Sequence, residues 1–174
     1  YVVTEAGFGA DLGAEKFLDI KCREGNLKVS AVVLVATLKA LKYHGGVKKQ
    51  DIQEENIDAL KKGIVNLEKH IDTLKKFNVP YVIALNRYMS DTEAEIRTFN
   101  EWAINNSHPY SLSEVFTKGG NGGIELATVM LNESLRGVSF LDERPTSTSL
   151  NARSFKSKHL FHTILSGSIC NSLP

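Results

Sequence analysis

The sequence predicts an α/β fold, in which helices cover a mostly parallel sheet. Three short apolar runs rich in valine, isoleucine or leucine do not alternate with polar residues; they span residues 1–3, 31–36 and 81–85. Such runs suit strands that are buried on both faces. Helical patterns lie between the runs, and parallel neighbouring strands need crossover connections of this kind. The alternation of run and helix therefore favours a parallel sheet.

A glycine-rich turn and a helix follow the first run. The helix is predicted over residues 11–24, and Gly25 ends it. The clearest helix lies between the second and third runs, where apolar residues recur at steps of three and four positions. These residues are Ile57, Leu60, Ile64, Leu67, Ile71 and Leu74. That helix ends near Asn78, because Pro80 disfavours the helical region at the residue before it.

A third helix is predicted over residues 91–104, after the third run. Asp91 or Thr92 can cap its first turn, and the acidic Glu95 complements the positive end of the helix dipole. Phe99 and Trp102 lie three positions apart on this helix. Large aromatic residues at that spacing are predicted to belong to the core.

The pattern of apolar and polar residues changes after about Leu131. A short run at residues 110–116 and a glycine-rich turn at residues 118–123 open a last predicted helix, which reaches Met130. Residues 142–174 then show neither a two-residue nor a 3.6-residue period. That pattern is typical of a poorly ordered or aberrant segment. We therefore expect one domain over residues 1–131 and an unrelated tail over residues 132–174.

The composition argues against several classes of partner and site. The chain carries 21 basic and 20 acidic residues, a formal net charge of +1, which leaves no excess charge for nucleic acid or an anionic membrane. No apolar run approaches the roughly 20 residues that span a bilayer. Cys22 and Cys170 lie far apart in no metal-ligand spacing. We therefore predict no metal site, no disulfide framework and a reducing, cytoplasmic location.

Candidate ligand-binding residues follow the predicted strands, because ligands collect at the carboxyl ends of parallel strands. After the first run, Gly7, Gly9 and Gly13 permit close backbone approach, and Phe8 offers an aromatic face for a base. The alternative is an ordinary tight turn with Phe8 folded into the core. The absence of a phosphate-loop lysine favours that alternative.

The second predicted strand ends in a polar cluster. Thr37, Lys39, Lys42 and His44 follow it directly, ahead of two glycines. Their hydroxyl, ammonium and imidazole groups suit phosphate or carboxylate oxygens. The alternative is that the lysines form a hydrated helix face and that His44 is a solvated turn residue. The residues by themselves leave both interpretations open.

The third predicted strand ends at Asn86, whose amide carries a donor and an acceptor and can pair with the edge of a base. The alternative makes Asn86 a turn residue and Asp91 a helix cap. No residue of the chain is assigned to catalysis from these patterns.

Taken together, these segments resemble formate–tetrahydrofolate ligase, also called formyltetrahydrofolate synthetase. Residues 35–46 follow that family's signature, which usually runs Val-Ala-Thr-Ile/Val-Arg-Ala-Leu-Lys-x-His/Asn-Gly-Gly. Further segments follow the family's order and spacing: residues 2–23, 82–95 and 116–127. The resemblance covers residues 1–131. Within the signature, Leu38 replaces a β-branched residue and Lys39 replaces arginine, which keeps the charge but loses the bidentate fork.

The resemblance implies a reaction in which ATP phosphorylates formate and the formyl phosphate formylates tetrahydrofolate. The product would be 10-formyltetrahydrofolate, an intermediate of one-carbon metabolism. The resemblance also implies a P-loop NTPase-like fold, ATP bound with Mg²⁺, and a homo-oligomeric full-length enzyme. It places Phe8, Gly9 and Asn86 against the adenine.

The sequence contains no Gly-x-x-x-x-Gly-Lys-Ser/Thr phosphate loop. Phosphoryl transfer depends on the positioning and charge neutralisation that such a loop supplies. The chain also begins on Tyr1, so we expect an interior fragment of the ligase, with its nucleotide-binding part over residues 1–131, that is inactive by itself. One alternative is a truncated product that acts only by binding the full-length enzyme. Another is a different ATP-dependent ligase or a nucleotide switch.

Overall fold

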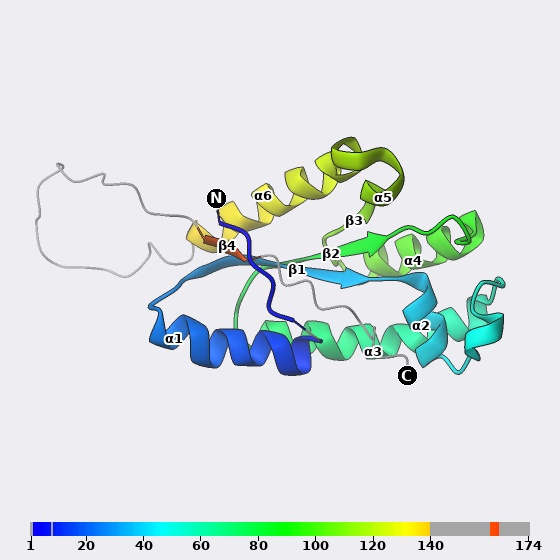
Figure 1. Cartoon of the computed structure of the whole chain (residues 1–174), viewed down its shortest axis with the longest axis horizontal. Coiled ribbons are helices and arrows are strands. Elements are labelled where there is room, and N and C mark those ends of the chain that lie inside the picture. The colour runs from blue at the N-terminus through cyan, green and yellow to red at the C-terminus, as the bar shows by residue number, and fades with distance from the viewer. Residues whose placement is uncertain (1, 8, 140–160, 164–174) are drawn as a thin grey trace, which may run out of the picture.

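A computed structural model describes residues 2–7, 9–139 and 161–163 of the chain. The described residues form a four-stranded parallel sheet with helices on both faces (Figure 1). The strand order is β3-β2-β1-β4. The strands are β1 (Val29–Ala36), β2 (Tyr81–Asn86), β3 (Tyr110–Ser113) and β4 (Phe161–Thr163). The predicted α/β class and parallel sheet are confirmed.

The register of the central strands brings their carboxyl ends to one edge. Ala36 of β1 pairs with Leu85 of β2, and Asn86 pairs with Ser113 of β3. The three strands therefore end almost level with one another. Any side chain that follows directly after them lies at this common edge.

The prediction of a covered strand at residues 1–3 is wrong for the two of these residues that the structure describes. Val2 makes only an isolated bridge, and its exposed fraction is 49%, while that of Val3 is 56%. Strand-forming side chains define an inner strand only where other elements bury both of its faces. At Val2 and Val3 no such cover is present, although the sequence pattern matches that of the inner strands.

The helix predicted over residues 11–24 is present, with a different internal geometry. Its parts are η1 (Ala10–Ala14), η2 (Phe17–Lys21) and α1 (Cys22–Glu24), of which the first two have the wider π-helical turn. Gly25 is the C-cap, as predicted. The segment lies alongside α3, and Ala10, Ala14 and Phe17 contribute to the main core.

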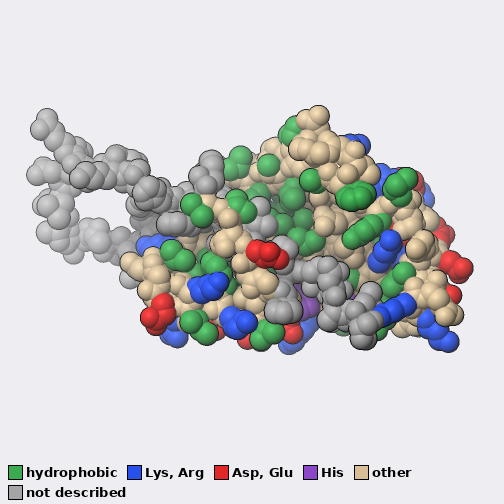
Figure 2. All heavy atoms as spheres, viewed as in Figure 1, with side chains coloured by type: hydrophobic (Ala, Val, Ile, Leu, Met, Phe, Trp, Pro, Cys, Tyr) green, Lys and Arg blue, Asp and Glu red, His purple; other side chains and the backbone are tan. Residues whose placement is uncertain are grey.

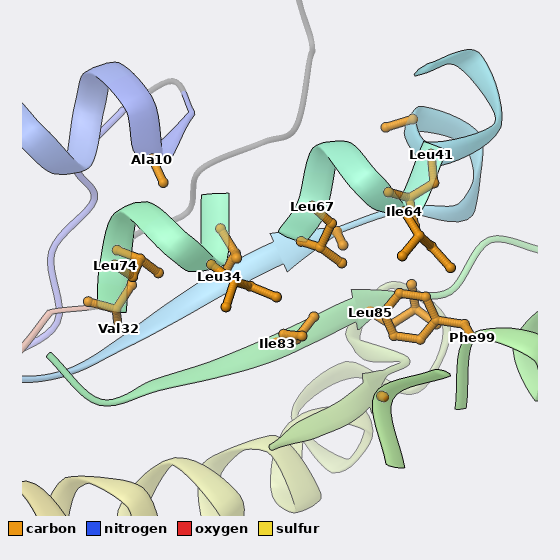
Figure 3. Close-up of a cluster of buried hydrophobic side chains, with 14 of the residues drawn as sticks. Ala10, Val32, Leu34, Leu41, Ile64, Leu67, Leu74, Ile83, Leu85 and Phe99 are labelled. Carbon is orange, nitrogen blue, oxygen red and sulfur yellow. The ribbon is translucent and has the colours of Figure 1, made fainter. Parts of the chain in front are cut away.

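One face of the sheet is covered by the long helix α3 (Ile57–Lys76) together with α4 (Glu93–Asn105). The predicted apolar stripe of α3 is buried through Leu60, Ile64, Leu67, Ile71 and Leu74. These side chains meet Val32, Leu34, Ile83 and Leu85 of the sheet and Phe99 of α4 (Figure 3). The core placement predicted for Phe99 is confirmed, since none of its surface is exposed, and Trp102 packs against the same cluster.

The opposite face is covered by α6 (Ile124–Ser139), which follows α5 (Val115–Lys118) and the short η4 (Gly119–Gly123). A smaller buried cluster forms there from Ala31, Val33, Val82, Ala84 and Met130. Figure 2 shows apolar side chains gathered in the upper half of the view, where α6 and the sheet lie. The predicted boundary near Leu131 falls inside α6, so the secondary structure does not change at that position. Most of the predicted tail lies outside the described residues.

Two short elements complete the fold at the carboxyl end of β1. The helix α2 (Leu38–His44) begins directly after Thr37, and η3 (Lys49–Asp51) connects it towards α3. Here α2 and α3 touch through their backbones. A Cβ atom added at Gly63 would lie 1.7 Å from the carbonyl oxygen of Leu41, and one at Gly45 would lie 1.9 Å from that of Ala59. Only glycine therefore fits at positions 45 and 63 in this packing.

Candidate functional site

Three of the predicted site residues come together at the carboxyl edge of the sheet. Thr37 follows the last residue of β1 and Asn86 ends the neighbouring β2, so the two leave adjacent strands side by side. The hydroxyl of Thr37 accepts a hydrogen bond of 3.1 Å from the amide of Ala40 and thereby caps α2. Lys39 lies in the first turn of that helix. We refer to Thr37, Lys39, Asn86 and the nearby Tyr88 as the carboxyl edge.

Tyr88 joins this group although the sequence interpretation did not single it out. The ammonium nitrogen of Lys39 lies 4.3 Å from the centre of the Tyr88 ring, a cation–π contact. The exposed fraction of Tyr88 is 45%, so part of the side chain faces solvent. The sequence did contain a signal for Tyr88, because it is an aromatic residue two positions after the end of β2. The edge thus presents a cation, an aromatic ring and an amide within a few residues of two strand ends.

The glycine-rich turn lies beside α3. A Cβ atom at Gly9 would lie 3.1 Å from Cε1 of His70, and one at Gly13 would lie 1.4 Å from the carbonyl oxygen of Gly7. Gly7 itself has a φ of +64°. Close backbone packing therefore requires glycine at position 13, and the positive φ favours glycine at position 7, as in the ordinary tight turn of the alternative interpretation. Phe8 lies outside the described residues.

His44 ends α2, five residues beyond Lys39, which is about 7.5 Å along a helix axis. Partial burial lowers the pKa of its imidazole. His70 of α3 also has a lowered pKa, because burial disfavours its charged form, while Asp11 opposes this shift and His44 adds to it. Gly9 therefore lies beside His70, and His44 lies close enough to His70 to influence its pKa.

Comparison with known protein families shows which family the chain belongs to. Residues 1–151 match the family of formate–tetrahydrofolate ligase. This range is most of the 174 residues and extends past Leu131. The chain belongs to the formate–tetrahydrofolate ligase family. Membership implies ATP-dependent ligation of formate and tetrahydrofolate as the activity of the family.

In this ligase chain Asp91 holds the loop that carries Tyr88. Its Oδ2 accepts a hydrogen bond of 2.8 Å from the amide of Tyr88, while Thr92 is the N-cap of α4. Of the two predicted caps of this helix, Thr92 is therefore confirmed and Asp91 is wrong. Burial raises the pKa of the Asp91 carboxyl, opposed by the hydrogen bond from Tyr88.

Lys42 of the ligase signature is buried, with an exposed fraction of 1%. Its Nζ lies 2.9 Å from Oε1 of Glu95, which is fully buried, and donates to the carbonyl oxygen of Glu54 at 2.7 Å. The interpretation of the signature lysines as a hydrated helix face is therefore wrong for Lys42. Sequence reasoning missed this ion pair, because the two residues are 53 positions apart (95 − 42) and both are of types that usually face water.

Two further findings bear on what the ligase chain can bind. Within the described residues, no three or more His, Cys, Asp or Glu side chains are grouped so that they could hold a metal ion. In the same part of the chain, every helix is too short or too polar to traverse a lipid bilayer.

Proposed function

We propose that this chain contributes the nucleotide-binding region, over residues 1–131, of an ATP-dependent ligase that joins formate to tetrahydrofolate. The proposed product is 10-formyltetrahydrofolate, formed by way of formyl phosphate. Family membership supports the ligase chemistry. The observation that carries the nucleotide assignment is the convergence of Thr37, Lys39 and Asn86 at the carboxyl edge, the part of a parallel sheet where ligands bind.

Each residue of the carboxyl edge has a proposed role. The side-chain amide of Asn86 lies at the end of β2 and offers a donor and an acceptor to the edge of adenine. The ammonium group of Lys39 and the hydroxyl hydrogen of Thr37 suit phosphate or formyl phosphate oxygens. We assign Phe8 and Gly9 to the face of the base, as the family resemblance implies. We assign His44 to phosphate or carboxylate oxygens, because it follows the same strand end as Thr37 and Lys39.

ATP supplies the phosphoryl group that activates formate. Mg²⁺ in such sites is held largely by the phosphates with one or two protein carboxylates, so a site for it does not require the three-residue groups that the described residues lack. The sequence contains no phosphate loop, which in P-loop enzymes cradles the β- and γ-phosphates. We therefore propose that the chain binds nucleotide but does not catalyse the phosphorylation of formate by itself. Formate-dependent release of ADP by the purified chain would contradict this.

ATP titration by calorimetry tests the nucleotide assignment. We expect Lys39→Ala and Asn86→Ala each to weaken binding by about tenfold, the loss of one charge-assisted or buried hydrogen-bonding group. Lys39→Arg restores the bidentate fork and should strengthen binding. Lys76→Ala is the matched control, because that lysine is exposed and lies at the opposite edge of the sheet, ahead of β2. Equal affinities in all four variants would rule out the carboxyl edge.

A second candidate function is favoured by the position of β3. This four-residue strand lies at one end of the described strand order, so one of its sides is available for pairing. A chain without catalytic activity could bind the full-length ligase through that edge. Co-purification with full-length subunits, together with absence of ATP binding, would favour this function over the first.

A further inference from the structure

We propose that the buried ion pair of Lys42 and Glu95 is a positioning device that holds the two sides of the carboxyl edge in register. The proposal rests on the proposed function, since it concerns the same edge. One side of the edge is the start of α2, which carries Thr37 and Lys39. The other side is the loop of residues 87–91, which carries Tyr88 and leads into α4.

The ion pair is costly to bury. Lys42 has an exposed fraction of 1% and Glu95 of 0%, and their charged atoms lie 2.9 Å apart. Removing two charges from water costs as much as, or more than, their attraction returns, so a buried ion pair is weak evidence for a stabilising role. Apolar residues of similar size fill such a space at least as well. Buried pairs are best attested where they specify one arrangement of neighbouring elements.

The Glu95 carboxylate contacts three elements at once. Oε1 accepts from Lys42 of α2 and, at 2.9 Å, from the amide of Asn56, the N-cap of α3. Oε2 accepts from the amide of Thr92, the N-cap of α4, at 3.4 Å. Lys42 in turn donates to the carbonyl oxygen of Glu54. The pair thus ties α2 to the amino-terminal ends of α3 and α4.

The contacts of Lys42 and Glu95 act on the carboxyl edge through α2 on one side and through the loop before α4 on the other. Lys39 lies three residues before Lys42, so both project from the same side of α2. The loop that ends at Thr92 is held by Asp91, whose Oδ2 accepts from the amide of Tyr88. Lys39 and Tyr88 then meet across the edge at 4.3 Å. The ion pair therefore lies one helical turn behind the contact that it positions.

A purely stabilising role and a positioning role predict different results for an apolar replacement. The double variant Lys42→Met/Glu95→Leu removes both charges and keeps similar volumes, which is often neutral or stabilising. It also removes the ties to the amides of Asn56 and Thr92 and to the carbonyl of Glu54. A positioning role predicts that the double variant still folds, with a urea midpoint lowered by the loss of these backbone partners, and that it loses the geometry of the edge.

The experiment compares the wild-type chain, the double variant and Glu68→Gln. Glu68 is the control because it also joins α3 to α4, through Nε1 of Trp102 at 3.0 Å, at a distance along the chain from the 87–91 loop. The measurements are the urea midpoint, hydrogen exchange of the Tyr88 amide and ATP titration. For the double variant we expect a folded chain with a lowered midpoint and ATP affinity weaker by about tenfold, the size of one lost hydrogen bond. We expect exchange at the Tyr88 amide to be faster by about tenfold relative to the amides of β1.

Three outcomes would overturn the proposal. The first is a double variant with wild-type exchange at Tyr88, and the second is an equal acceleration there in Glu68→Gln. The third is a double variant that unfolds, because the pair would then be needed for folding itself. If the wild-type chain fails to bind ATP, the proposed function fails, and the exchange of the Tyr88 amide still decides whether the ion pair positions the loop.

Discussion

Three histidines occupy partly buried positions that favour their neutral forms. Burial lowers the pKa of His44, His70 and His108 below the ordinary value of 6.5. At His70 the neighbouring Asp11 partly opposes the effect of burial, with Nδ1 of the imidazole 3.7 Å from the carboxylate oxygen. Protonation of these side chains therefore disfavours the folded state.

The free energy of unfolding should fall as the pH is lowered through 6.5 towards the pKa of His70 in the folded chain. Across that window the unfolded chain binds more protons than the folded chain, so stability is retained above 6.5 and lost below it. His70→Gln should lose less stability than the wild type over this window. Urea unfolding at about pH 7.5 and about pH 5.5 measures the difference. An equal loss in both proteins would show that His70 does not contribute.

At the residue scale, the sequence predicted which side chains lie at strand ends better than it predicted which side chains are buried. Thr37, Lys39 and Asn86 could be placed together because each lies at or just after the end of a strand, and parallel strand ends share an edge. The burial of Lys42 and Glu95 could not be predicted, because it depends on a partner 53 positions away (95 − 42). The capping box marks Glu95 as the partner of Thr92, but no local pattern indicates that Glu95 and Lys42 are buried against each other.

At the scale of elements, α3 gives the most direct test of the packing. Leu67 is fully buried in the main core, whereas Val65, two residues earlier on the same helix, has an exposed fraction of 63%. Leu67→Ala should lower the free energy of unfolding by about 2–5 kcal/mol, through lost burial and a cavity. Val65→Ala is the control and should change it by about 0.5 kcal/mol or less. Equal effects in urea titration would contradict the placement of α3.

Elements with a period or a cap of their own could be predicted. The stripe of α3 repeats over 20 residues, and α4 begins with a capping box of Thr92 and Glu95. Residues 1–3 carry the same kind of apolar run as β1, but whether a run becomes an inner strand depends on what covers it. The π-helical turns of η1 and η2 leave no comparable mark in the sequence.

At the scale of the whole molecule, one side chain reports on the main core. Trp102 is the single tryptophan of the chain. Its ring lies 5.2 Å from that of Phe99, between centroids, and its Nε1 donates to Glu68 of α3. The segment of η1 and η2, helices α3 and α4 and the sheet all share the cluster to which this ring belongs.

We therefore expect one cooperative transition when the chain is unfolded by urea. Tryptophan emission reports the core around α4, and far-UV circular dichroism reports all helices, so the two curves should coincide if the core unfolds as a unit. Glu68→Gln should shift both curves together. Curves with separate midpoints would show that α6, on the other face of the sheet, or the amino-terminal helix unfolds independently of the main core.

The glycine contact between α2 and α3 limits which amino acids the protein can accept far from any ligand. Since a methyl group at position 45 or 63 would collide with a main-chain oxygen of the facing helix, even alanine would push α2 outward. Thr37 and Lys39 stand on α2 and would be carried away from Asn86. Gly45 and Gly63 thus govern the spacing of the groups that we propose to bind nucleotide, and a loss of affinity after mutation there would come from displacement of intact groups.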